Sequence, residues 1–362
     1  MGINDIIIYI MVAFMALGAI DKVLGNKFGI GEQFEEGIMA MGTLAIAMIG
    51  VICLAPVIST VLEPVVVPVF TALGADPAMF AGALLANDMG GYSLAVEMAQ
   101  NPAIGNFSGL ILGSMMGATV VFIIPVALGI INKEDTPFFA KGVLAGVITI
   151  PIGCIAGGLV QGLTIGTILV NLVPIIIVAA LIALGLWKAP NAIIKGFTIF
   201  GKGVTAIITI GLAAAIIEAL TGIVVIPGMA PIEEGITVVG DIAIVLAGAL
   251  PLVYVITKVF KKPLMKVGAL LGINEVAAGG MIAALANTIP MFGMMKDMDN
   301  RGKVISVAFA VSASFILGDH LGFTAGVNKD MISAMMIAKI VAAITAVIVA
   351  CIITPKNDSV KA

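Results

Sequence analysis

Long apolar runs dominate the hydrophobic pattern of the chain. Nine of them extend over about 20 residues with few charges, which is the length that an α-helix needs to cross the hydrocarbon core of a bilayer. A membrane β-barrel would instead alternate apolar and polar residues over about ten positions. The pattern therefore predicts spanning helices at 5–24, 37–62, 107–131, 139–160, 165–187, 203–225, 236–258, 304–325 and 332–354.

Two further apolar stretches, 78–98 and 276–295, have polar and helix-breaking residues at their centres. The first contains NDMGG at 87–91, and the second contains NTIP at 287–290. Broken backbone at membrane depth is tolerated only where it is buried in protein or lines a cavity, and it often marks a solute site. Both stretches are therefore predicted to be broken helices or re-entrant hairpins.

The chain also repeats part of its own sequence about 200 residues later. EEGIMAMGTLAIAMIG at 35–50 and EEGITVVGDIAIVLAG at 233–248 agree at eight of sixteen positions. LILGSMMGAT at 110–119 matches FILGDHLGFT at 315–324 in the same order and at a similar separation. These matches predict an internal duplication. Its parts are a first transmembrane repeat at 1–160, a linker helix at 161–190 and a second transmembrane repeat at 191–362.

The basic residues favour one membrane topology. If the nine runs cross, the two interrupted stretches re-enter and the N-terminus lies outside, then most of the 18 Lys and Arg residues lie at the cytoplasmic face. Lys329 then lies outside, and Lys339 sits within a helix near the outer face. The second repeat starts on the opposite side from the first. The predicted fold is an all-α polytopic membrane protein with about 9–11 transmembrane segments, arranged as an inverted repeat.

Composition excludes several other classes of protein. The chain is 61% apolar and 11% charged, whereas soluble domains carry about 25% charged residues, so the expected surroundings are a lipid bilayer. A net charge of −3 without a basic stripe argues against a nucleic-acid partner. Cys53, Cys154 and Cys351 lie within apolar runs and the sequence has one His, so no metal site is expected. The sequence contains no nucleotide-binding or catalytic motif, so neither a cofactor nor an enzymatic activity is predicted.

Asp88 is the first candidate for solute binding. A carboxylate deep in a helix bundle is costly and is functional by default, and Asn87, Tyr92 and Ser93 stand beside it. A carboxylate, an amide, a hydroxyl and an aromatic face together suit a small cation that carries a hydroxyl. The structural alternative is an Asp that caps the N-terminus of a half-helix, and the two roles are compatible.

A second group of candidates lies in the other half of the chain. Asp319 and His320 are adjacent within a predicted span, and an imidazole that titrates near neutral pH is able to relay a proton. Asn287 corresponds to Asn87 in the repeat and is followed by Thr288 and Phe292. The amide of Asn287 suits both an ammonium and a hydroxyl. Buried packing is the structural alternative for His320 and Phe292, and hydrogen bonding to loose backbone is the alternative for Asn287.

Five long stretches carry a resemblance to a known family over essentially the whole chain. They are GEQFEEGIMAMG at 31–42, LLANDMGGYSLA at 84–95, GVLAGVITIPIGCIAGGLV at 142–160, ANTIPMFGMMKDMDNRGKVI at 286–305 and FILGDHLGFTAG at 315–326. The sequence resembles the EutH family, the ethanolamine permeases of ethanolamine utilisation. The resemblance implies a multi-pass protein of the bacterial cell membrane whose partner is ethanolamine, and it implies no residue-level mechanism.

Three hypotheses follow. The first is facilitated diffusion of ethanolammonium by alternating access, with Asp88 as the counter-charge. The second is proton-coupled symport of ethanolamine or a related small amine, with Asp319 and His320 as the relay. The third is a membrane scaffold or sensor, against which the short loops argue. The sequence also allows a homo-oligomer.

Overall fold

The computed structural model describes residues 2–355, apart from the side chains at 190, 191, 194, 260–262 and 264. Throughout this part the regular structure is helical, with no strand. The α-helices are α1 (Ile3–Val23), α2 (Ile30–Ala72), α3 (Met79–Leu84), α4 (Tyr92–Met98), α5 (Pro102–Asn106), α6 (Ile124–Ile130), α7 (Thr136–Val147), α8 (Ile150–Val160), α9 (Ile165–Lys188), α10 (Pro190–Thr221), α11 (Ile232–Leu271), α12 (Glu275–Ala284), α13 (Thr288–Met294), α14 (Asn300–Ala313), α15 (Asp319–Val327) and α16 (Ile332–Ile353). Wider π-helical turns form η1 (Asn87–Gly91), η2 (Phe107–Gly117) and η3 (Thr119–Ile123), and single 3-10 turns form η4 (Lys133–Asp135), η5 (Met295–Asp297) and η6 (Lys329–Met331).

Eight helical segments within residues 2–355 are long and apolar enough to cross a membrane. They are Ile3–Val23, Ile30–Ala72, Pro102–Ile130, Lys133–Val160, Ile165–Lys188, Lys195–Thr221, Ile232–Val259 and Lys329–Ile353. Each coincides with one of the nine runs predicted to span, so the prediction of an all-helical, multi-pass membrane protein is confirmed.

The ninth predicted span, 304–325, was wrong as one continuous helix. The chain leaves the helical conformation between α14 and α15, where Phe315 has a φ of +62°. The freed backbone is not left unpaired, because the Phe315 N–H donates to the Ala284 carbonyl at 3.1 Å and the Leu317 N–H donates to the Leu285 carbonyl at 3.0 Å. Hydropathy could not reveal this break, since the residues around it are apolar and their new partners come from another helix.

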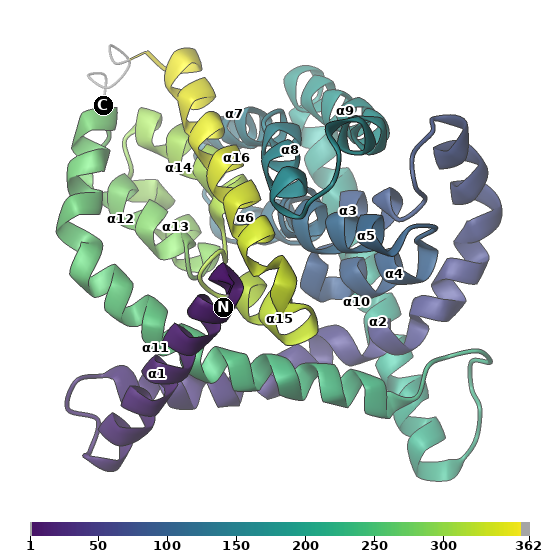
Figure 1. Ribbon diagram of the computed structural model, residues 1–362. Helices are drawn as coiled ribbons and strands as arrows, with labels where there is room; N and C mark the ends of the chain where they lie inside the picture. Colours follow the sequence, from purple (N-terminus) through teal and green to yellow (C-terminus); the bar gives the residue numbers. More distant parts are fainter. Residues whose placement is uncertain (1, 356–362) are drawn as a thin grey trace.

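Two helices are much longer than predicted. α2 has 43 residues and α11 has 40, against predicted spans of 37–62 and 236–258. Figure 1 shows them side by side along the lower edge of the view, each turning upward at an opposite side. Proline lies inside both, including Pro56 in α2 and Pro251 in α11, and internal proline is a common cause of such bends.

Glycine allows several helix pairs to approach closely. A Cβ atom at Gly142 or Gly146 of α7 would meet side-chain atoms of α14 at 2.6 or 2.5 Å, and one at Gly153 of α8 would meet the Ala338 carbonyl of α16 at 2.4 Å. Helices in lipid gain little from the hydrophobic effect, and small residues let their backbones pack instead. These contacts hold α7 close to α14 and α8 close to α16.

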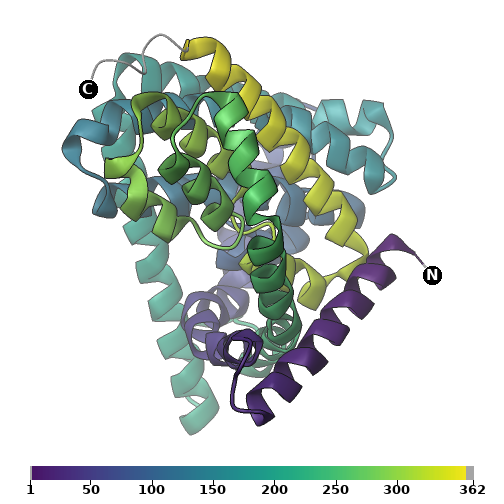
Figure 2. The ribbon, with the colours of Figure 1, turned by 90° about the vertical axis from the view of Figure 1, so that its left-hand side faces the viewer.

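The helix α1 lies at the edge of the molecule, where Figure 2 shows it as an arm that ends at the N-terminus. One side of α1 packs closely on α11, because a Cβ at Gly248 would meet the Met11 carbonyl at 2.4 Å. Ile6, Ile10 and Leu17 on the same helix are exposed. A helix that is apolar all round is typical of a membrane span, so lipid is expected to cover this side.

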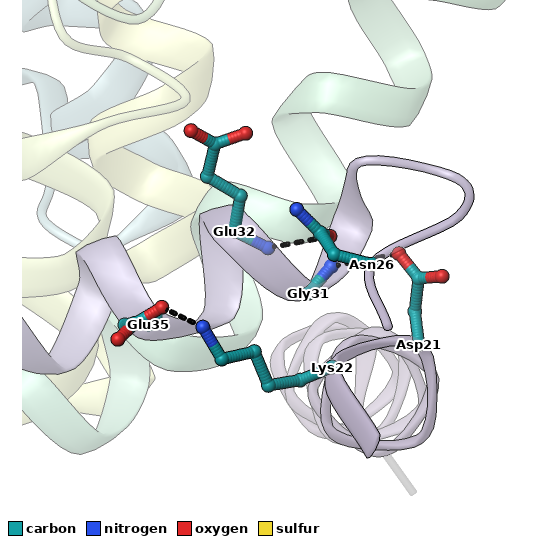
Figure 3. Close-up of polar contacts among 6 residues, drawn as sticks. All are labelled: Asp21, Lys22, Asn26, Gly31, Glu32 and Glu35. Carbon is teal, nitrogen blue, oxygen red and sulfur yellow. Dashed lines mark hydrogen bonds and ion pairs between the residues drawn. The ribbon is translucent and has the colours of Figure 1, made fainter. Parts of the chain in front are cut away.

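Polar groups hold the loop between α1 and α2 in place (Figure 3). The Asp21 carboxylate is buried and accepts hydrogen bonds from three backbone N–H groups, among them that of Gly31 at 3.0 Å. Asn26 lies within the loop in the left-handed region and accepts from the first turn of α2. Lys22 and Glu35 form an exposed ion pair across the two helices. These contacts fix the angle at which α2 leaves α1.

Candidate functional site

Interrupted segments meet in the interior. The break between α12 and α13 pairs with the break between α14 and α15 through the two hydrogen bonds given above. A third break at Leu85 and Ala86 is extended and precedes η1. Gly117 of η2 sits against it so closely that a Cβ would lie 1.8 Å from the Leu85 carbonyl oxygen. Non-helical backbone is thereby buried in protein, as membrane depth requires.

The turn that carries Asp88 depends on a glycine. Met89 and Gly90 leave the helical conformation inside η1, and Gly90 has a φ of +92°. A Cβ at Gly90 would also lie 2.2 Å from the Val51 side chain of α2. An L-residue is disfavoured at this position both by its backbone conformation and by the lack of space. The turn therefore holds Asp88 at the start of the half-helix α4.

Lys339 is the centre of the polar interior, although it was not among the predicted site residues. Its side chain is fully buried on α16. Its Nζ donates to the Ser114 carbonyl of η2 at 2.6 Å and contacts Nδ1 of His320 on α15 at 3.0 Å. The sequence does contain a signal for it, because Lys339 is the one cation within the apolar run of α16. An ionisable group at membrane depth is costly and marks a functional site, and this argument applies to Lys339 as it does to Asp88.

Asp88 and Asp319 lie on elements that contact each other, η1 and α15. Each side chain is half-buried. The two carboxylates repel each other electrostatically, and Asp88 is also attracted by Lys339. The structure thus brings three of the predicted site residues, Asp88, Asp319 and His320, into one region, where His320 contacts Lys339 directly and Asp88 interacts with it electrostatically.

Asn87 is buried beside Asp88, with 1% of its surface exposed, and neither its amide nitrogen nor its amide oxygen has a hydrogen-bond partner. The hydroxyls of Thr288 and Thr324 are also buried without a partner. A buried polar group left unsatisfied costs about 1–3 kcal/mol, so each such group needs an explanation. The simplest explanation is that a polar solute or water hydrogen-bonds to these groups.

The predicted aromatic residues have different surroundings. The half-buried Tyr92 ring meets Phe323 of α15 edge to face, with 5.8 Å between centroids, so it packs α4 against the element that carries Asp319. Ser93 follows it and is also half-buried. Phe292 is buried against Phe139 of α7, with 6.0 Å between centroids. That contact places Phe292 in helix packing.

Asn287 lies at a cavity of about 660 Å³ between α2, α11, α12 and α13. Its Oδ1 accepts from the Ile289 N–H at 2.9 Å and so caps α13. The polar residues around the same cavity include Gln33, Tyr254 and Lys258. Asn287 thus lines a cavity and also has the structural role that the sequence left open.

The cavity is adjacent to the acidic pair. Ala286 lines it, and the carbonyl of Ala286 lies so close to Gly318 that a Cβ there would be 2.3 Å away. Asp319 follows Gly318 directly. The negative charge of Glu36 on α2 also acts electrostatically on Asp319. Glu36 lies about one turn beyond Gln33. Only a short stretch of backbone therefore separates the cavity from Asp319.

The whole chain is similar to one family of proteins. The family described as "Ethanolamine utilisation protein, EutH" matches residues 3–353. A Listeria monocytogenes protein named probable ethanolamine permease EutH is 68% identical over 337 residues, covering 93% of this chain and 90% of the relative. A Salmonella typhimurium protein of the same name is 52% identical over 399 residues, covering 100% and 98%. A Bacillus subtilis protein described as uncharacterised, YxeR, is 53% identical over 93% of this chain and 91% of its own length. No solved structure matches the chain.

Proposed function

Because the chain belongs to the EutH family of ethanolamine utilisation proteins, we propose that it carries ethanolamine, as the ethanolammonium cation, into the bacterial cytoplasm. The family is one of permeases, so the chain is a transporter of the cell membrane and not an enzyme. The single observation that best supports the proposed substrate is the pair of half-buried carboxylates, Asp88 and Asp319, beside an Asn87 amide that has no partner.

The chemistry of the substrate fits these groups. Ethanolamine is a primary amine that is protonated at neutral pH, as a Lys-like amine is, and it carries one hydroxyl. Asp88 supplies the counter-charge for the ammonium. The Asn87 amide, which both donates and accepts, suits the hydroxyl. Tyr92 offers an aromatic face, and Phe323 holds its ring in place.

The cavity at Asn287 is the proposed vestibule. It has room for a molecule of this size, since about 660 Å³ lies within the range typical of small-molecule sites. A cation that enters there passes Ala286 and Gly318, reaches Asp319 and then Asp88. The electrostatic influence of the exposed Glu36 on Asp319 extends the acidic character of this route toward the entrance.

Alternating access is the proposed mode of movement, with an inverted repeat as its framework. The proposed repeats are 1–160 and 191–362, with 161–190 as linker. Two observations support this. Helices at corresponding places pack on one another, as α2 does on α11 and α8 on α16, and the chain is interrupted at Leu85–Ala86 and again between α12 and α13. Half-helices at such breaks are proposed to re-enter the membrane and to bind the solute.

The test is uptake of radiolabelled ethanolamine by purified protein in liposomes. A uniporter of the cation accumulates its substrate in response to voltage, and about 2.3 kcal/mol per charge at 100 mV corresponds to roughly 50-fold. We expect saturable uptake that follows an inside-negative potential and ceases without protein. Uptake no faster than in empty liposomes at any potential would contradict the proposed function.

Proton-coupled symport is the second candidate, and the contact between Lys339 Nζ and His320 Nδ1 favours it because it joins two buried groups that can exchange a proton. Asp319 and His320 are the proposed relay. Uptake is compared with and without a pH gradient at fixed voltage. Acceleration by an inward proton gradient supports symport, and insensitivity to it supports the uniporter.

A further inference from the structure

Two buried cations in the described part of the chain, Lys339 and Arg301, hydrogen-bond only to neutral atoms, and Arg301 donates to two backbone carbonyls. Asp135 is paired with Lys303 at 2.6 Å, and Asp21 and Asp76 accept hydrogen bonds from backbone N–H groups. Lys339 has only neutral atoms within hydrogen-bond distance, the Ser114 carbonyl and a ring nitrogen of His320. A fully buried ammonium needs an opposite charge nearby.

The hydrogen-bond geometry fits a charged Lys339 beside a neutral His320. A carbonyl oxygen only accepts, so Lys339 donates to Ser114, and the 2.6 Å distance is as short as charge-assisted bonds are. When the Lys339 ammonium also donates to His320, Nδ1 must be its acceptor and the imidazole is neutral, with its proton on Nε2. In this arrangement the positive charge belongs to Lys339 alone.

The negative charges come from two half-buried carboxylates. Asp88 interacts electrostatically with both Asp319 and Lys339. Glu36, which also acts electrostatically on Asp319, is exposed on α2 toward the entrance of the proposed route, so its charge is counted with the entrance and not with the site. When all three groups are ionised, two carboxylates against one ammonium leave a net charge of minus one, and one monovalent cation neutralises that charge.

We propose that Lys339 is a fixed counter-ion that sets the charge capacity of the substrate site, so that the site admits one monovalent ammonium and discriminates against a dication. This inference rests on the proposed function. It also orients the substrate. Two of the three ammonium donors of Lys339 are used, and the third has no partner within residues 2–355. The substrate ammonium lies toward Asp88 and Asp319, and its hydroxyl accepts from Lys339.

The test compares two ligands of nearly equal size that differ in charge. Ethanolamine is one, and ethylenediamine, held at a pH at which both of its amines are protonated, is the other. Binding to the purified protein is measured as the ligand-induced rise in Tm, and transport as competition against labelled ethanolamine. The readout is the ratio of the two apparent affinities, which a merely structural role for Lys339 would not change.

Lys339→Gln removes the charge and keeps an N–H donor, and Lys339→Arg keeps the charge. We expect the Gln variant to lose preference for ethanolamine over ethylenediamine by about tenfold or more, and the Arg variant to retain the preference. An unchanged ratio in the Gln variant overturns the inference.

Asp319→Asn tests the charge count without any change at Lys339, and unchanged ethanolamine binding by this variant overturns the inference. Asp319→Asn brings the site to zero charge and is expected to weaken ethanolamine binding about tenfold or more. Adding Lys339→Gln to it restores minus one and should recover the binding. A folded double variant that binds no better than Asp319→Asn overturns the inference. A wild-type protein that binds ethanolamine without moving it contradicts the proposed function and leaves this inference intact.

Discussion

Lys339 Nζ lies 3.0 Å from Nδ1 of His320, and both side chains are buried although they come from different helices. This contact connects α16 to the start of α15, where the carboxylate of Asp319 precedes the imidazole. It also draws the predicted acidic residues and the only histidine of the chain into one polar interior. Changes in this polar interior, in the helix packing and in the loop between α1 and α2 are expected to have four measurable effects.

Asp88→Asn is expected to abolish saturable ethanolamine uptake while the protein still inserts and folds. The amide keeps the size of the side chain and removes the counter-charge, and breaking a close charge pair at a binding site costs about 2–5 kcal/mol. The measurement is initial uptake rate against concentration in liposomes. Glu97→Gln is the matched control, since Glu97 is exposed on the adjoining α4 and should be neutral. Wild-type uptake by Asp88→Asn would remove this residue from the site.

Asn87→Leu separates a binding role from a structural one. The amide is buried without a partner, so replacing it with an apolar side chain of similar size should leave Tm unchanged or raise it, by relieving up to about 1–3 kcal/mol of desolvation cost. Uptake should nevertheless fall, because the substrate loses a partner for its hydroxyl. A variant that is both less stable and equally active would show that Asn87 is structural.

Gly50→Ala is expected to destabilise the contact between α2 and α10. A Cβ at Gly50 would lie 1.9 Å from the Ile208 carbonyl oxygen, so the helices must separate, at a cost of about 1–3 kcal/mol. Thermal unfolding in detergent measures the effect. Gly42→Ala on the same helix is the control. A Cβ there meets nothing within 4 Å, and alanine favours the helix by up to about 1 kcal/mol. Equal Tm values for the two variants would contradict the close packing.

Asp21→Asn tests the loop between α1 and α2. Both carboxylate oxygens accept backbone N–H groups, and an amide presents a donor where one of those acceptors stood, so Tm should fall by several degrees. Glu35→Gln removes the partner of Lys22 in an exposed ion pair and should change Tm little. Should the Glu35 variant prove the less stable of the two, the loop would depend on its surface pair instead.

The sequence determined the helical class, eight of the spans and the presence of broken backbone near Asn87 and Asn287, because apolar run length and helix-breaking residues are local properties. It also singled out Asp88, Asp319 and His320, since an ionisable group in an apolar run is conspicuous. Only the tertiary structure decided that Phe315 interrupts a ninth run, that Phe292 packs on Phe139, and that Lys339 reaches His320 and Ser114, the latter 225 residues away along the chain. Those outcomes depend on which helices approach one another closely, and close approach is set by glycine contacts between distant segments, which hydropathy does not record.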